Sequence, residues 1–250
     1  MNNLFIVGAQ RSGTSYLQQI LNEHNEVEMT RMSSSEPKFF LNKNIKIKDK
    51  IYYENKYFDH PKKKTKYLGE KSTSYFENEY ALKNIKKLYP EGRILLILRN
   101  PVMRAYSNYL FTLKNNLEEL SFSDSLAIEN ERIKNKYFTT SVNPYAYRSR
   151  GVYIKFIKKL FNIFNPKQIK ILIFEEFINN ALAIKKLYNW LEIDETFTPL
   201  SINQKINESL NINNKDSNAL NELYIHYRES INDLEEFLNF KIDSWHEDKF

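Results

Sequence analysis

Short apolar runs alternate with longer segments of helical periodicity along most of the chain. Runs dominated by apolar residues occur at 4–7, 94–98 and 169–174, and a shorter candidate strand occurs at 66–68. Their length and their branched side chains predict strands. An uninterrupted run such as ILLIL is typical of a strand that is buried on both faces of a sheet.

The segments between these runs predict helices. In the segment 77–89 the expected apolar positions are Tyr80, Ile85, Leu88 and Tyr89. Further helices are expected at 15–22, 151–164, 180–191 and 216–238, and Pro101 suits the first turn of another. Strands that alternate with helices predict an α/β fold, with a P-loop-like central parallel β-sheet flanked by helices on both faces.

Composition narrows the class of protein. The chain has 250 residues, of which 42% are hydrophobic, so we expect a single domain over 1–250 with a loop-rich insertion at about 42–66. Cysteine is absent, which excludes disulfides and thiolate chemistry. No apolar run is long enough to span a membrane and no leader pattern is present, so the expected location is cytoplasmic. The net charge of +6 favours an anionic partner.

The stretch GAQRSGTS at 8–15 follows the first predicted strand and has two glycines at the spacing of a phosphate-binding P-loop. The lysine of that motif is missing, because Thr14 follows Gly13 and the nearby cation is Arg11. Backbone amides and hydroxyls in such a loop can hold a 5′-phosphate, but the loop lacks the lysine that grips a triphosphate. A simple glycine turn with a solvated Arg11 is the structural alternative.

Two stretches resemble the sulfotransferases that use 3′-phosphoadenosine-5′-phosphosulfate (PAPS) as co-substrate. RSGT at 11–14 matches their 5′-phosphosulfate loop, and RILLILRNPVMRAYSNY at 93–109 is similar to their 3′-phosphate signature. Arg104, in the second stretch, is expected at the surface or facing the substrate. The resemblance implies that the donor is bound by Gln10, Arg11, Ser12, Gly13, Thr14, Ser15, Arg99 and Ser107, with Tyr153 and Lys205 as further candidates.

Two more motifs imply the chemistry. SSSEPKFF at 33–40 resembles the K-E-P-H-F-F element of Golgi-type and bacterial glycan sulfotransferases, in which the glutamate is the general base, so Glu36 is the predicted base. Ser35 and Lys38 stand where that pattern often has Lys and His. The structural alternative is that Glu36 is simply a loop carboxylate.

LGEKSTSYF at 68–76 is similar to the family's E-K-[ST]-x-x-Y-F stretch. Lys71, together with Arg11, would then stabilise the charge that develops as the sulfuryl group departs, without a metal. The structural alternative is a pair between Glu70 and Lys71. Thr73, Ser74 and Tyr75 are candidates to line the acceptor pocket.

These motifs predict a PAPS-dependent sulfotransferase that acts on a hydroxyl or amine of a small-molecule or glycan acceptor, with a carbohydrate favoured. The four histidines show no metal-ligand spacing, so no metal site is predicted. The alternatives are a P-loop kinase for a small metabolite and a non-enzymatic nucleotide- or nucleic-acid-binding protein. Nucleic-acid binding would use the positive charge but explains none of the ordered motifs, so no nucleic-acid partner is expected. The oligomeric state is not predicted.

Overall fold

A computed structural model describes most of the chain, in which two compact units can be distinguished. The first unit comprises Met1–Leu98 and Lys159–Ile206, and the second comprises Arg99–Lys158 and Asn207–Phe250. The described residues are 1–31, 36–59, 64–135, 140–204 and 216–246.

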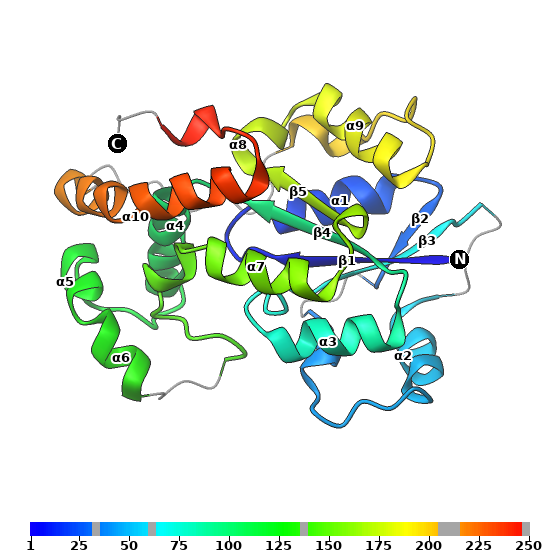
Figure 1. Cartoon of the computed structure of the whole chain (residues 1–250), viewed down its shortest axis with the longest axis horizontal. Coiled ribbons are helices and arrows are strands. Elements are labelled where there is room, and N and C mark those ends of the chain that lie inside the picture. The colour runs from blue at the N-terminus through cyan, green and yellow to red at the C-terminus, as the bar shows by residue number, and fades with distance from the viewer. Residues whose placement is uncertain (32–35, 60–63, 136–139, 205–215, 247–250) are drawn as a thin grey trace. The chain divides into compact units, whose positions relative to one another are not determined.

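The first unit is built on a five-stranded sheet in the order β2-β3-β1-β4-β5 (Figure 1). Every pair of neighbouring strands is parallel, so the predicted central parallel sheet is confirmed. Leu4–Val7 and Ile94–Leu98 are almost completely buried, as their uninterrupted apolar runs indicate. The strands are β1 (Asn2–Gly8), β2 (Val27–Met29), β3 (Tyr67–Lys71), β4 (Arg93–Leu98) and β5 (Ile169–Ile173).

Helices cover both faces of this sheet, as predicted (Figure 1). On one face α1 (Thr14–Glu23) and α9 (Ala181–Leu191) pack with Leu4 and Ile6 of β1 in one apolar cluster. The intervening Phe5 points to the opposite face, because side chains alternate along a strand. There its ring meets Phe40 and Tyr89 at centroid distances of 5.6 and 5.3 Å. The elements near this aromatic side are the short helix η1 (Phe39–Leu41), α2 (Asp49–Tyr57) and α3 (Glu79–Leu88).

The second unit is helical. Its longest helix, α10 (Ser217–Leu238), contacts α4 (Pro101–Lys114). Pro101 is the first residue of α4, where it has no amide to leave unpaired, and the Asn100 side chain accepts a 3.0 Å hydrogen bond from the Val102 amide. The shorter elements are α5 (Phe122–Ala127), α6 (Glu129–Asn135), η2 (Ser149–Gly151) and η5 (Asp243–Trp245).

Helix α7 (Ile154–Ile163) is divided between the two units, because residues 154–158 belong to the second unit and the rest belong to the first. Three short helices follow α7 in the first unit. They are η3 (Pro166–Gln168), α8 (Phe174–Phe177) and η4 (Leu200–Asn203). No helix of the described segments is long and apolar enough to cross a bilayer.

Some elements differ from the sequence predictions. The three-residue β2 was not predicted, and the segment 42–66, expected to be loop-rich, contains α2. Tyr80 was expected on the apolar face of its helix but is 42% exposed. The buried face of α3 is formed instead by Ala81, Leu82, Ile85 and Leu88. The helix predicted to start at Gly151 begins at Ile154, after the separate turn η2.

Asn84 on α3 gives a test of how this fold is held together. Its buried side-chain amide donates to the carbonyls of Phe40 (2.9 Å) and Asn42 (3.0 Å). Asn84→Asp removes both donors and places a carboxylate against two carbonyls, so the free energy of unfolding should fall by about 2–4 kcal/mol. Urea denaturation measures the change. As a control, Lys83→Ala removes only an exposed ion pair with Glu79 and should cost about 0.5 kcal/mol or less. Equal effects of the two substitutions would contradict this account.

Candidate active site at the ends of β1 and β3

The loop between β1 and α1 is shaped to receive an anion. Gly13 has a φ of 84°, in the left-handed region, and a Cβ at this position would lie 2.7 Å from Cδ2 of Phe174. No side chain caps α1 and no acidic residue lies in its first turn. Its first amides therefore lack helical partners, and the positive end of the helix dipole faces the loop.

The predicted loop residues differ in their exposure. Ser12 is fully buried, yet its Oγ has no hydrogen-bond partner among the described residues. Thr14 is also buried, whereas Gln10, Arg11 and Ser15 are half-buried. A buried hydroxyl without a partner is unfavourable, and an oxygen of a bound phosphate group would satisfy it. The loop therefore fits the 5′-phosphate side of a nucleotide donor.

Lys71 lies beside this loop because β1 and β3 are paired in parallel. The register places Lys71 opposite Ile6, so the residues after both strands emerge at the same edge of the sheet. The Nζ of Lys71 lies 3.5 Å from Oγ of Ser15 and 3.7 Å from Oε1 of Glu36. The structure thus brings together three residues that were predicted from separate motifs.

The carboxylate of Glu36 is held in a defined position. It accepts hydrogen bonds from the Thr73 amide (3.1 Å) and from Thr73 Oγ1 (2.9 Å), in addition to its ion pair with Lys71. Its side chain is still 19% exposed, so it can be reached by a substrate. A fixed, accessible carboxylate next to a cation is an arrangement that can accept a proton during a reaction.

Glu70 has a different environment from Glu36. It is 1% exposed and accepts hydrogen bonds from the hydroxyls of Tyr53, Ser72 and Tyr75 at 2.5, 2.6 and 2.7 Å. Burial raises the pKa of Glu70, although these donors oppose the shift. The ion pair of Lys71 is with Glu36, so the alternative pairing of Glu70 with Lys71 is not the arrangement in the structure.

One expectation for the stretch after Lys71 is wrong. Tyr75 is fully buried and its hydroxyl donates to Glu70, so it does not line an acceptor pocket. Ser74 is buried too, and its Oγ has no hydrogen-bond partner among the described residues. Thr73, which was also expected to line that pocket, holds the predicted base. The sequence signal for this role was the hydroxyl residue that follows Lys71 by two positions, but it does not identify Glu36 as the partner.

The residues predicted to bind the 3′-phosphate belong to the second unit. Arg99 directly follows β4 in the chain, and its carbonyl accepts a 2.8 Å hydrogen bond from the Tyr153 hydroxyl. Ser107 is buried on α4. Arg104 is 1% exposed and donates to the carbonyl of Tyr147, so the expectation of a surface position was wrong. Lys205 lies outside the described residues.

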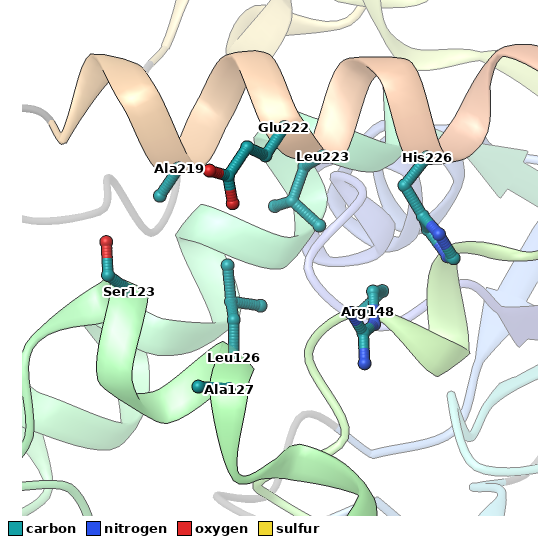
Figure 2. A pocket seen from close by; sticks show the side chains of 8 residues that line it. All are labelled: Ser123, Leu126, Ala127, Arg148, Ala219, Glu222, Leu223 and His226. Atoms are coloured by element: carbon teal, nitrogen blue, oxygen red, sulfur yellow. The ribbon is translucent and has the colours of Figure 1, made fainter.

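A small pocket in the second unit contains none of the predicted site residues (Figure 2). Its volume is about 150 Å³, and α10 contributes Glu222 and His226 while α5 contributes Ser123 and Leu126. Burial, with the charge of the neighbouring Arg148, lowers the pKa of His226. In the described segments no three His, Asp or Glu side chains gather in a metal-binding arrangement.

Comparison with known proteins gives one consistent result. A family model described as a sulfotransferase domain matches residues 1–248. The chain is 27% identical over 203 residues to the bifunctional heparan sulfate N-deacetylase/N-sulfotransferase 1 of Caenorhabditis briggsae, covering 77% of this chain and 23% of that protein. For the human protein of the same name, identity is 36% over 110 residues, covering 42% of this chain and 12% of the relative. The chain therefore spans less than a quarter of the length of these relatives.

A solved structure agrees with this result. The crystal structure of a sulfotransferase from Alicyclobacillus acidocaldarius has a TM-score of 0.79 and 26% sequence identity, with 99% of each chain covered. Its match extends over both units, as does that of the family model. These matches show that the chain belongs to the sulfotransferase family of enzymes.

Proposed function

We propose that this enzyme transfers a sulfuryl group from PAPS to an amine or hydroxyl of a carbohydrate, with Glu36 as the general base. One observation carries the proposal: Lys71 reaches both Glu36, at 3.7 Å, and Ser15 in the first turn of α1, at 3.5 Å. A candidate base and a cation therefore lie next to the loop that fits a phosphate group. The cytoplasmic location expected from the sequence remains a prediction.

The donor side of the proposal uses both predicted groups of residues. PAPS supplies a sulfuryl group attached to its 5′-phosphate, and Gln10–Ser15 would bind that end through amides and hydroxyls. The unsatisfied Oγ of the buried Ser12 supports this assignment. Arg99, Ser107 and Tyr153 would bind the 3′-phosphate, and Lys205 is a further candidate for contact with the donor. Arginine suits this task because its guanidinium can donate two parallel hydrogen bonds to a phosphate.

The transfer itself needs a base and positive charge. The nitrogen or oxygen of the acceptor attacks sulfur, and the bond between sulfur and the bridging oxygen of the 5′-phosphate breaks. Glu36 takes the proton that the acceptor loses. Lys71 and Arg11 stabilise the negative charge that remains on 3′-phosphoadenosine 5′-phosphate (PAP). A positioned base of this kind contributes roughly 10²–10⁴-fold to the rate.

The acceptor is inferred from the relatives, which are named for N-sulfation of heparan sulfate. A glucosamine tetrasaccharide with free amines, its N-acetylated form and a simple phenol form a suitable panel with ³⁵S-labelled PAPS in the presence of EDTA. We expect label on a sugar, and loss of label on N-acetylation identifies the amine as the acceptor. Transfer to the phenol alone would contradict a carbohydrate acceptor. Magnesium-dependent transfer of phosphate from ATP, with no sulfate transfer, would favour the kinase alternative.

Donor selectivity provides a second test. Calorimetry should show tight binding of PAP and poor binding of ATP, because the loop lacks the P-loop lysine and Arg99 would pair with a 3′-phosphate that ATP does not have. Arg99→Ala should weaken PAP binding by about 1.5–3 kcal/mol, the range for a hydrogen bond to a charged group. Adenosine 5′-phosphate serves as the control ligand, because its affinity should change little in this variant. Equal affinity of the wild-type enzyme for PAP and ATP would contradict the donor assignment.

Glu36→Gln separates the chemistry from donor binding. The substitution keeps size and polarity but cannot accept a proton, so kcat should fall by roughly 10²–10⁴-fold. The dissociation constant for PAP should stay the same, because the loop residues and Arg99 are unchanged. Glu91→Gln, which removes an exposed carboxylate of the same unit, is the matched control. Near-wild-type turnover in Glu36→Gln would show that the base is another group.

A further inference from the structure

The buried carboxylate of Glu70 is linked through hydroxyl groups to the segment that carries Glu36. Ser72 Oγ and Tyr75 Oη both donate to Oε1 of Glu70, at 2.6 and 2.7 Å. The same two oxygens also accept from backbone amides: Ser72 from Lys38 (2.9 Å) and Tyr75 from Phe40 (3.2 Å). Two separate paths therefore connect Glu70 with the backbone just after Glu36.

The direction of these hydrogen bonds is fixed by the carboxylate. An ionised carboxylate can only accept, and each hydroxyl has a single proton to donate. The protons of the Ser72 and Tyr75 hydroxyls therefore point to Glu70, and their oxygens accept from the amides of Lys38 and Phe40. The carboxylate thus orients both hydroxyls as acceptors for the backbone. Removal of the carboxylate would leave them free to rotate.

The segment after Glu36 needs such support. Lys38 has a φ of 51°, in the left-handed region that a residue with a side chain seldom adopts. The amides of Lys38 and Phe40 flank this disfavoured conformation on the way to η1. Without the two acceptors, the backbone could relax and move Glu36 relative to Thr73 and Lys71.

We propose that Glu70 is a positioning residue for the general base, acting through Ser72 and Tyr75 on the backbone that carries Glu36. This inference rests on the proposed function, in which Glu36 accepts the acceptor's proton. Glu70 itself is 1% exposed and does not contact substrate. Its role is to keep the carboxylate of Glu36 in place, and small displacements of a reacting group are known to cost much of a rate.

Ionisation of Glu70 is part of this arrangement, because a neutral carboxyl group would add a proton of its own to a cluster in which Tyr53, Ser72 and Tyr75 all donate. The groups around it are Tyr53 from α2, Tyr89 after α3, Tyr75 and Glu36, and burial raises the pKa of Glu70. The native state therefore binds this proton more tightly than the unfolded chain. The stability of the wild type relative to Glu70→Gln should consequently fall as pH rises from about 4.5 through the raised pKa. A pH-independent difference in urea denaturation would contradict the raised pKa of Glu70.

Tyr53 offers a matched control within the same cluster. Its hydroxyl donates to Oε2 of Glu70 at 2.5 Å, whereas Tyr75 donates to Oε1 and also accepts from Phe40. Tyr53→Phe and Tyr75→Phe each remove one buried hydroxyl and keep the ring. The first substitution leaves both paths to the Glu36 segment intact, and the second breaks one of them.

The experiment compares these two variants with Ser72→Ala and Glu70→Gln. Sulfate transfer from PAPS to the glucosamine tetrasaccharide gives kcat, calorimetry gives the Kd for PAP, and amide hydrogen exchange reports protection at Lys38 and Phe40. We expect kcat to fall roughly 10- to 100-fold in Tyr75→Phe, Ser72→Ala and Glu70→Gln, with unchanged PAP affinity and lost amide protection. In Tyr53→Phe, kcat should stay within about twofold of the wild-type value and amide protection should persist, even if the midpoint of unfolding falls as far as it does in Tyr75→Phe.

Equal losses of kcat in Tyr53→Phe and Tyr75→Phe would overturn the proposal, because Glu70 would then serve only the stability of the core. Lost protection with unchanged kcat would overturn it as well. Glu36→Gln separates this failure from that of the proposed function. If Glu36→Gln is slow while Tyr75→Phe, Ser72→Ala and Glu70→Gln are not, the base assignment holds and only the positioning role fails. If Glu36→Gln turns over normally, the base assignment itself fails.

Discussion

The parallel pairing of β1 with β3 is the constraint on which the rest of the site depends. Its register places Ile6 opposite Lys71 and Phe5 opposite Glu70. The pairing continues beyond the strands, because the amides of Ser72 and Phe76 donate to the carbonyls of Ile6 and Val7 at 3.1 and 3.0 Å. A shift by one residue would send every side chain of β3 to the opposite face. The donor loop, Lys71 and the residues that hold Glu36 all owe their proximity to this register.

Alternation along β3 gives two neighbouring residues opposite tasks. Lys71 lies at the half-buried edge, where it pairs with Glu36. Glu70 points into the aromatic side of the sheet and is stabilised by hydroxyl groups of Tyr53, Ser72 and Tyr75. A buried carboxylate is costly unless every lone pair is used, so such a group keeps its neighbours in fixed positions. In the proposed mechanism Lys71 stabilises developing negative charge, and Glu70 keeps the carboxylate of Glu36 in position.

The strong local signals in the sequence were sufficient to predict several of the main elements of the fold. The runs in β1 and β4, the glycine loop and the Pro101 start of α4 are all encoded by adjacent residues, and the structure has them. Elements with weak local signals were missed: β2 has three residues, and α2 buries only Tyr53. Sequence motifs also pointed to Glu36 and Lys71 as separate candidates, but their ion pair depends on strand register.

The tertiary environment of single residues could not be inferred in the same way. The hydrogen bond from the Phe40 amide to the Tyr75 hydroxyl joins positions 35 residues apart, and no local pattern in the sequence indicates it. For that reason Tyr75 was assigned to a pocket, whereas it is fully buried. Arg104 was expected at the surface or facing the substrate, yet it is 1% exposed and its guanidinium donates to the carbonyl of Tyr147 inside the second unit.

The central claim is that the loop after β1 and the end of β3 form a single sulfuryl-transfer site. A crystal structure of the enzyme with PAP tests this claim most directly. We expect the 5′-phosphate at the amides of Ser12–Ser15, within hydrogen-bond distance of Lys71 Nζ and Ser12 Oγ. PAP bound in the pocket between α5 and α10, with the loop after β1 empty, would contradict the account.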